Sequence, residues 1–350
     1  MMKTGDQNEG SIGFAAEARR SAVAWKLRTP TLRDSERVDA AYRGRGPSYP
    51  FCIPVAAANR NLLPDARAIA LERFAAGKIQ WHDELHGGPS NHLLSSQVQC
   101  VNCLAPFVDR PAELATILGE ALPIREVVPF GARTDTLFDR DDHVVFEWIG
   151  TRDYLGERAN GGGSRGAKTT SADAAIRYVN HDGEAEVALI EWKYTERYLG
   201  SELAGDARYM NARKERYRAL WSAADGPLKR DLIPYDDLFV DPFYQLMRLQ
   251  LLASEMEKDR AVRAKAVRLL VVAPSRNLEL AESFNRWSQR TLGSSDLFAP
   301  ADTIWESWRA MQRRPDRFAV LDSAVLIGAG APTSPEFKDR YGHLALNRGA

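Results

Sequence analysis

Apolar residues recur at helical spacing in three segments of the first third of the chain. These segments cover about 62–80, 92–104 and 112–121, and each predicts an amphipathic helix. The second follows the loop sequence GGPSN and ends before Pro106, and both features are typical of helix boundaries. Residues 1–50 are rich in Arg, Ser and Gly and show weak periodicity. We expect them to form a loosely ordered arm with at most one short helix around 14–25.

The pattern changes to that of β-strands in the middle of the chain. Three β-prone runs lie at 143–150, 172–180 and 186–194, and the loop at 156–170 is rich in Gly. A helix is expected from about 243 to 257, with Asp241 as its N-cap and Pro242 at its first position. A buried strand at 266–274 follows, and two more helices and a strand (FAVLDSAVLIGA) close the chain.

The order of these elements predicts the fold class. Helix, strand, strand, strand, helix, strand is an α/β core in which a three-strand meander is followed by a crossover. We therefore expect three regions: the N-terminal arm at 1–50, the core at 51–275, and a C-terminal extension of helices and a strand, packed on the core, at 276–350.

Composition and charge set limits on function. The chain has 350 residues, 44% of them hydrophobic, which is ample for a buried core, and its 47 basic residues balance its 47 acidic residues. A dedicated nucleic-acid coat protein would be strongly basic, whereas an enzyme that holds a short duplex needs only a local basic surface. The polar N-terminus and the lack of an apolar run of roughly 20 residues predict a cytoplasmic protein with no membrane partner.

Two charged residues end a strand that is otherwise apolar. In VALIEWK, Val187 and Leu189 lie on one face, and the residues between them lie on the other, so the strand is expected to be buried on both sides. Period-two geometry places Glu191 and Lys193 on the same face. Buried ionised groups are costly unless they are paired or bind a metal, so this pair indicates a functional site.

The hairpin before this strand supplies a second carboxylate. If its turn is centred on Asp182, Asp173 lies directly opposite Glu191, and the two acids share a side of the sheet with Lys193. A two-residue turn at Asp182 and Gly183 would instead put the acids on opposite faces. We expect the odd-numbered turn.

Two carboxylates and an ammonium group suit phosphodiester hydrolysis. Asp173 and Glu191 are the expected ligands of Mg²⁺, with Mn²⁺ as an alternative, and Lys193 would orient the attacking water. These three are the predicted catalytic residues. The alternative is a buried structural cluster of Asp, Glu and Lys, because ion pairs in cores have the same composition.

At these residues the sequence resembles the PD-(D/E)xK nuclease superfamily. Asp173, Glu191 and Lys193 match the motif, whereas Ala172 replaces its proline. The resemblance implies a restriction-endonuclease-like core. The wider text at about 78–275, including LIEWKYTE and DPFYQLMRLQLLA, is similar to a group of bacterial restriction-endonuclease-like proteins.

The resemblance also implies supporting residues. The superfamily often places a further acid on the first core helix, but the helix at 92–104 offers only Gln97 and Gln99. Glu147, on the first strand, is the nearest substitute, and a structural role is its alternative. Gln245 and Arg248 lie on the helix after the motif, where related nucleases place residues that face the site.

Two other motifs do not favour a second cofactor. The segment GGSRGAKT has Ala167 where a phosphate-binding loop needs Gly, and it leads into a strand, so we expect no nucleotide cofactor. Cys100 and Cys103 have zinc-like spacing, but a fourth ligand is lacking and both fit an apolar helix face, so we expect no zinc.

Basic residues near the motif are the expected contacts to nucleic acid. The segment 207–221 interleaves basic residues with Tyr and Trp, and a solvated helix face is the alternative interpretation. The predicted substrate-binding residues are Arg165, Lys168, Arg213, Lys214 and Arg216.

These observations predict a metal-dependent DNA endonuclease of a restriction or defence type. Double-stranded DNA is the expected partner, and two cuts in a duplex would favour a homodimer. One alternative is an inactive nuclease fold that serves as a nucleic-acid-binding or complex-assembly module. Another is a metal-dependent hydrolase of small phosphate esters, which would have a closed pocket around Asp173 instead of a long basic trough.

Overall fold

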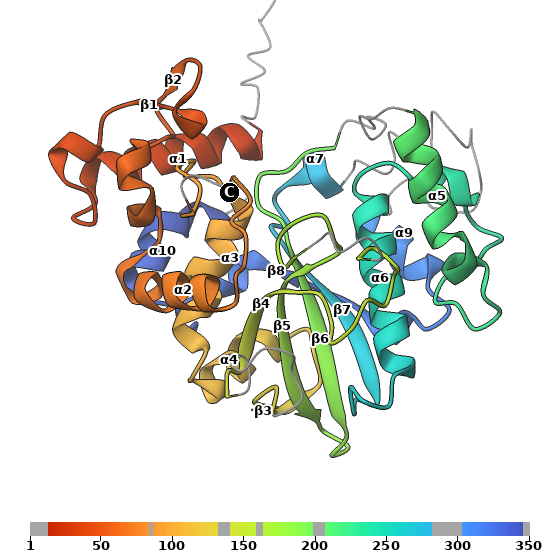
Figure 1. The fold of residues 1–350 in the computed structure, drawn as a ribbon. Coiled ribbons are helices and arrows are strands. Elements are labelled where there is room, and N and C mark those ends of the chain that lie inside the picture. Colours follow the sequence, from red (N-terminus) through yellow and green to blue (C-terminus); the bar gives the residue numbers. More distant parts are fainter. Residues whose placement is uncertain are drawn as a thin grey trace, which may run out of the picture.

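A mixed six-stranded sheet crosses the middle of the molecule (Figure 1). The computed structural model describes residues 13–83, 87–131, 141–158, 164–198, 207–281 and 303–345. The strands are β3 (Ile124–Val128), β4 (Val144–Trp148), β5 (Ala172–Asn180), β6 (Ala185–Trp192), β7 (Ala266–Ala273) and β8 (Phe318–Asp322). Their order is β3-β5-β6-β7-β8, with β4 also paired to β5. The strands from β3 to β6 pair antiparallel, whereas β6–β7 and β7–β8 pair parallel. The expected meander and crossover are therefore present, in a mixed α/β fold.

Helices cover both faces of this sheet (Figure 1). On one face lie α1 (Phe14–Arg28), α2 (Pro64–Ala76), α3 (Ser96–Leu104), α4 (Pro111–Leu118) and α10 (Pro335–Tyr341). On the other lie α5 (Ala207–Ser222), α6 (Phe243–Lys258) and α9 (Ile304–Met311), and the short α7 (Leu278–Ala281) also joins the core on this side. Short 3-10 helices connect these elements at Asp34–Glu36, Tyr42–Gly44, Val55–Asn61, Ala105–Phe107, Tyr235–Leu238, Pro315–Arg317, Ser323–Ile327 and Gly342–Leu344.

Strand β6 is buried on both sides, as its sequence predicts. Val187 and Leu189 pack in the core that contains α5, α6 and α9. Ala188, Ile190 and Trp192 pack in the core that contains α1–α4 and α10. A strand with two apolar faces can only be central, and β6 lies between β5 and β7.

The β5–β6 hairpin has the register that the odd-numbered turn requires. Ala174 pairs with Ile190 and Ile176 with Ala188, which is the pairing expected for a turn centred on Asp182. The Asn180 backbone N–H donates to the Glu184 carbonyl at 2.9 Å and closes the turn. Gly183 takes a positive φ of 83° there, which glycine adopts without a steric penalty. The register prediction is confirmed.

The sequence missed one strand and misplaced one helix start. Strand β3 (IREVV) escaped prediction because Arg125 and Glu126 interrupt its apolar pattern, and it pairs with the far half of β5 beyond β4. Helix α6 begins at Phe243, with Pro242 as its N-cap residue, and Asp241 does not cap it. The centre of the Gly-rich loop, 159–163, and residues 1–12 of the arm lie outside the described residues.

The expectation of a loosely ordered arm at 1–50 is wrong for the part that the structure describes. Helix α1 buries Phe14, Ala18 and Trp25 in the first core, because small Ala residues allow it to pack closely. Lys26 is only 1% exposed, and its ammonium group forms an ion pair with Asp39 at 3.0 Å. Lysine usually indicates a solvated helix face, but Lys26 lies in the protein interior.

The chain's last described segment packs against this N-terminal layer. The buried Arg340 guanidinium lies over the Trp25 ring at 4.4 Å and donates to the Asn61 carbonyl at 2.7 Å. Arg28 forms an ion pair with Asp339 at 2.8 Å. Residues 303–345 thus add α9 and α10 to the two faces of the sheet, and β8 adds an edge strand to it.

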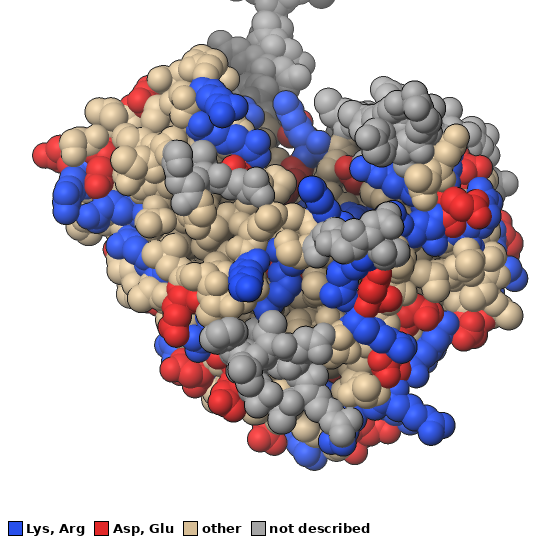
Figure 2. All heavy atoms as spheres, viewed as in Figure 1, with Lys and Arg blue, Asp and Glu red and all other residues tan. Residues whose placement is uncertain are grey.

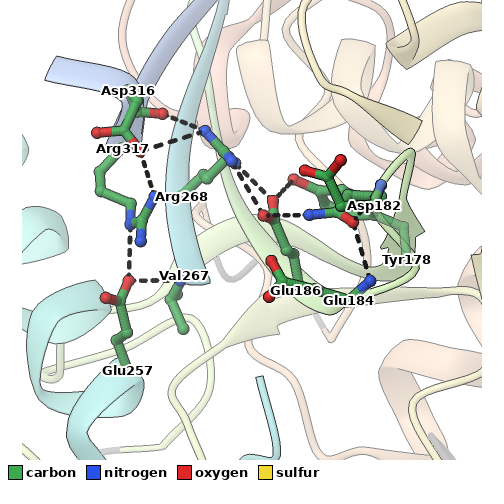
Figure 3. A network of polar contacts seen from close by, with 10 residues as sticks. Tyr178, Asp182, Glu184, Glu186, Glu257, Val267, Arg268, Asp316 and Arg317 are labelled. Atoms are coloured by element: carbon green, nitrogen blue, oxygen red, sulfur yellow. Dashed lines mark hydrogen bonds and ion pairs between the residues drawn. The ribbon is translucent and has the colours of Figure 1, made fainter. Parts of the chain in front are cut away.

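A buried polar network joins the turn end of the hairpin to β7 and β8 (Figure 3). The Glu186 carboxylate, 2% exposed, accepts hydrogen bonds from Tyr178 at 2.6 Å and from Arg268 at 2.6 and 3.0 Å. Arg268 also donates to the Asp316 carbonyl. Glu186 is buried, Arg268 is half-buried and the two are hydrogen-bonded, so removing Arg268 or Glu186 leaves the other charge uncompensated.

We expect Glu186→Gln to lower the free energy of unfolding by about 3 kcal/mol at pH 7, since breaking a buried ion pair costs about 3–5 kcal/mol. Burial by itself raises the pKa of Glu186, but its bonds to Arg268 and Tyr178 outweigh burial and lower this pKa. The stabilisation is therefore present above the unfolded pKa of about 4.3 and is lost as the pH falls through the folded pKa. Urea unfolding at pH 7 and pH 3 measures both effects.

Glu184→Gln on the same hairpin is the matched control, because Glu184 forms only a surface pair with Lys265 at 3.4 Å. Equal stability losses in the two variants, or a Glu186 effect that persists undiminished at pH 3, would contradict this assignment.

Candidate active site

Three acidic residues lie side by side at the end of the sheet away from the hairpin turn. In β4 and β5, Phe146 pairs with Ala174 and Trp148 with Ala172, so Glu147 lies opposite Asp173. Continuing the β5–β6 register by one residue sets Asp173 opposite Glu191. The acids therefore come from three adjacent strands and occupy one row across the sheet.

Glu191 and Lys193 form a buried ion pair. The Lys193 ammonium lies 2.7 Å from the Glu191 carboxylate and donates to the Gln245 side-chain oxygen at 2.5 Å. Burial alone would lower the pKa of Lys193, but Glu191, together with Tyr198, Glu196 and Asp173, outweighs burial and raises this pKa well above its ordinary value. Lys193 is therefore a fixed positive charge, held from two sides by β6 and α6.

Asp173 has one strong hydrogen bond and an unfavourable electrostatic environment. Its carboxylate accepts from the Trp192 backbone N–H at 2.6 Å. Burial, then the charges of Glu191 and Glu147, raise the pKa of Asp173 well above its ordinary value, and Lys193 only partly offsets them. The site holds more negative charge than its own cation compensates.

Glu147 has an unusual backbone and two hydrogen-bond donors. Its φ is 48°, a left-handed conformation that is uncommon for a residue with a side chain and clusters at functional sites. The alternation of β4 breaks here, because Val145 and Trp148 pack in the same core. Gln97 and Ser171 donate to the carboxylate at 2.6 and 2.7 Å.

Burial, together with the charge of Glu191, raises the pKa of Glu147, although the bonds from Ser171 and Gln97 oppose this shift. Helix α3 thus contributes amides where the superfamily often has an acid. Gln97 orients Glu147, and Gln99 accepts from the Trp192 indole N–H at 2.9 Å, so both glutamines support the strand ends.

Gln245 and Arg248, predicted to support the site, both face it from α6. Gln245 holds the Lys193 ammonium. The Arg248 guanidinium lies over the Tyr244 ring at 4.6 Å and donates to the Thr170 hydroxyl at 3.3 Å. Its Nε is buried and has no hydrogen-bond partner among the described residues.

These side chains line one cavity of about 800 Å³. The three acids, Lys193, Gln245 and Arg248 form one wall. The lining also includes residues between 42 and 92 that the sequence analysis did not identify, among them Tyr42, Tyr49, Phe51, Asp83 and His92. They lie in irregular segments, so no periodic pattern marked them.

A second, basic pocket of about 500 Å³ adjoins this cavity and shares Thr169, Gln245 and Arg248 with it. Lys168, Arg213 and Arg216 line it and form no ion pair among the described residues. Its two carboxyls are Glu157, bound by Thr169, Thr170 and Tyr217, and Asp241, whose pKa is raised by burial. Lys and Arg side chains gather around the hollow between the N-terminal layer and the α5–α6 side (Figure 2).

Two predicted substrate-binding residues, Arg165 and Lys214, do not line either pocket. Arg165 is 6% exposed, and its guanidinium donates to the backbone carbonyls of Phe146 and Glu147, so it holds the β4 end in place. Lys214 forms an ion pair with Asp236 at 2.9 Å and lies over the Phe239 ring. Each charge already has a partner inside the protein.

Gly166 explains how the loop before Asp173 can lie so close to the core. An added Cβ would lie 2.3 Å from the Gln80 carbonyl oxygen, and the φ of this residue is 79°. Only glycine fits both constraints. The adjacent Arg165 carbonyl accepts from the Gln80 backbone N–H at 3.0 Å.

Cys100 and Cys103 are buried in α3 as free thiols, and burial raises the pKa of both. Among the described residues, no group of three or more His, Cys, Asp or Glu side chains is arranged to hold a metal ion on its own. None of the described helices is long and apolar enough to cross a membrane.

The geometry is that of a buried acid–lysine cluster at the end of a mixed sheet. Residues 19–342 match the family described as restriction endonuclease associating with ARP. Because this match spans most of the chain, the protein belongs to that family, and it is a restriction-endonuclease-like protein. No curated protein and no solved structure shows significant similarity to it.

We expect Asp173→Asn to stabilise the fold at neutral pH, because burial and the charges of Glu191 and Glu147 disfavour the Asp173 carboxylate that this change removes. The amide oxygen can still accept the Trp192 N–H, and the buried charge is gone. The sign follows from the raised pKa: the wild type loses stability as the pH rises from the unfolded pKa of about 3.9 through the folded pKa.

Thermal unfolding between pH 4 and 8 measures this difference, which should grow with pH. Asp182→Asn is the control, since Asp182 is exposed at the hairpin turn. A destabilised Asp173→Asn variant, or a gain equal to that of the control, would disprove the electrostatic account.

Proposed function

We propose that this protein is a metal-dependent nuclease of the PD-(D/E)xK type. The main observation that supports this proposal is the row of Glu147, Asp173 and Glu191 across three strands. Lys193 forms an ion pair with Glu191 in this row. The order α3, β4, β5, β6, α6, β7 agrees with the core that the sequence resemblance implies, and β3, β8 and the outer helices add to it.

The donor set fits a hard divalent cation. Mg²⁺ is commonly held by one or two carboxylates together with waters and substrate phosphate oxygens, so a preformed cluster of three ligands is not required. Asp173 and Glu191 are the proposed ligands, and Mn²⁺ accepts the same oxygen donors. The raised pKa of Asp173 supports this assignment, because an added cation would relieve its repulsion from Glu191. When bound, Mg²⁺ supplies a water of lowered pKa and neutralises charge on the phosphate.

The protein's own groups orient and stabilise the reaction. Lys193 places a permanent positive charge beside Glu191, where it orients the attacking water and offsets charge that develops on the phosphate. Gln245 fixes the ammonium group through its side-chain oxygen. Glu147, fixed by Gln97 and Ser171, supports the row as a further acceptor.

The basic pocket supports a polymeric substrate. It continues the catalytic cavity and offers Lys168, Arg213, Arg216 and Arg248 to phosphates on one side of the scissile bond. A small phosphate ester would need only the catalytic cavity. We therefore propose DNA, held as a duplex in a restriction or defence setting, with a homodimer making the two cuts.

The second candidate function is an inactive nuclease fold that binds nucleic acid or assembles a complex. The observation in its favour is that Glu191 already has a charged partner, because the Lys193 ammonium lies 2.7 Å from its carboxylate. Cleavage assays separate the two candidates.

We expect the wild type to cut nucleic acid in the presence of Mg²⁺ and not in EDTA. Lys193→Ala and Glu191→Gln should each lower the cleavage rate by at least about 100-fold, because the first removes positive charge beside the reacting phosphate and the second removes a proposed Mg²⁺ ligand. The measurement uses plasmid, linear duplex and single-stranded substrates. Lys265→Ala, which removes an exposed lysine at the far end of β7, should leave the rate unchanged.

Cleavage that survives in Lys193→Ala would exclude this active site. If no substrate is cut while nucleic acid still binds, the inactive binding module becomes the better description.

Arg213→Ala and Arg216→Ala should each weaken DNA binding and reduce the slope of log K against log salt by about 1, since each removes one phosphate contact. Binding is measured in EDTA at several salt concentrations. Lys214→Ala is a matched control on the same helix: it removes an equal charge that is already paired with Asp236, so the slope should not change. A slope that falls equally in all three variants would show only a general charge effect.

A further inference from the structure

Part of the lining of the cavity that holds the acids is aromatic. Tyr42, Tyr49, Phe51 and His92 all line it, and all four are half-buried. Tyr49 stacks on Phe51 with ring centroids 5.2 Å apart, and His92 packs against Phe51 and Tyr42 at 5.0 and 5.5 Å. The rings thus form one continuous aromatic wall, a name we use for these four residues.

Backbone pairing holds this wall in place. Leu93 donates to the Phe51 carbonyl at 2.9 Å and Ile53 to the Asn91 carbonyl at 3.0 Å, on either side of the Cys52–His92 bridge. Tyr49 lies on the small ribbon of β1 (Ala40–Ala41) and β2 (Ser48–Tyr49). The rings are therefore fixed before any ligand arrives, which lowers the entropic cost of binding.

The wall is also electrically neutral. Burial and the hydrogen bond to Asp83 raise the pKa of Tyr42 to about 12, so the phenol keeps its proton. Burial lowers the pKa of His92, which favours the uncharged imidazole. The cations nearby lie on the rings: Arg43 over Tyr42 at 5.2 Å and Arg19 over Phe51 at 5.7 Å.

A neutral aromatic surface offers no charge to bind a phosphate backbone, whereas an unstacked nucleobase can stack on it. Aromatic side chains bind bases that are not stacked in a duplex, and each such contact changes affinity by about five- to 100-fold. A paired, stacked base exposes no face to such a wall unless it is extruded. A cavity of about 800 Å³ lies within the range of about 300–1,000 Å³ that holds compact ligands.

We propose that the cavity receives an unstacked nucleobase against the aromatic wall, so that the substrate presents a single-stranded or extruded nucleotide beside the scissile phosphate. This inference rests on the proposed nuclease function and narrows its substrate. The acid row meets the phosphate, the basic pocket holds the neighbouring backbone, and the aromatic wall holds the base.

The test measures binding in EDTA at fixed salt, so that it does not depend on cleavage. The probes are oligonucleotides with 2-aminopurine in a single strand of DNA, a single strand of RNA, a duplex with a one-base bulge and a fully paired duplex. We expect the single strand of at least one sugar type and the bulged duplex to bind at least about 10-fold more tightly than the paired duplex. Their fluorescence should also fall, because the base stacks on the rings.

Tyr49→Ala should weaken single-strand binding by about five- to 100-fold, and Tyr49→Phe, which keeps the ring, should restore it. Trp305→Ala on α9 is the control for losing a half-buried aromatic ring outside the cavity, and its affinity should equal that of the wild type. If Tyr49→Ala does not fold, the inference is tested by the change in 2-aminopurine fluorescence when the oligonucleotides bind to the wild type.

Equal affinity for the single strand and the paired duplex overturns this inference, as does an unchanged affinity in a folded Tyr49→Ala variant. Fluorescence that does not fall on binding overturns it too. These outcomes leave the nuclease proposal standing if paired duplex is cut. Conversely, single-strand binding with no cleavage on any substrate would end the nuclease proposal and keep the base-binding wall.

Discussion

Three carboxyl groups on neighbouring strands share one ammonium group, and the structure around that end of the sheet is organised by this imbalance. Burying like charges together is unfavourable unless hydrogen bonds or cations compensate them. The Trp192 amide, Gln97, Ser171 and Lys193 each supply part of that compensation. Burial, and then the remaining repulsion between the acids, raises the pKa of Asp173 and Glu147. The fold thus keeps an excess of negative charge at this site. A substrate complex with a divalent ion would neutralise that charge.

The sheet also separates two kinds of surface around the cavity. Helices α5 and α6 bring cations to the basic pocket, and the segments at 42–51 and around His92 bring neutral rings to the cavity. A nucleotide has the two matching parts, because its phosphate is charged and its base is a flat neutral ring. The two proposals therefore use different walls, and a defect in one does not require a defect in the other.

Local geometry explains why the acid–lysine cluster could be predicted from sequence. A strand's period of two fixes which residues share a face, and the turn length fixes which residues lie opposite across a hairpin. Both rules concern neighbouring residues, so Asp173, Glu191 and Lys193 follow from the text of one hairpin. Gln245 could be placed because a helix after the motif has one side free to face the strand ends.

Other features escaped prediction because they depend on distant partners. The left-handed conformation of Glu147 is imposed where Arg165 binds its backbone and Gln97 binds its side chain. The aromatic wall is assembled from loops that carry no period. Arg165 and Lys214 look like surface cations in the sequence, yet each is taken up by a group that the sequence does not place beside it.

The contact between Arg340 and Trp25 joins segments from opposite ends of the chain. Arg340 also binds the Asn61 and Leu93 carbonyls, and Leu93 pairs with Phe51, beside the aromatic residues that line the cavity. During synthesis from the N-terminus, that brace is missing until helix α10 has left the ribosome. A growing chain would therefore carry the acid row before the aromatic wall is braced, and the complete cavity would form only when translation of this region ends.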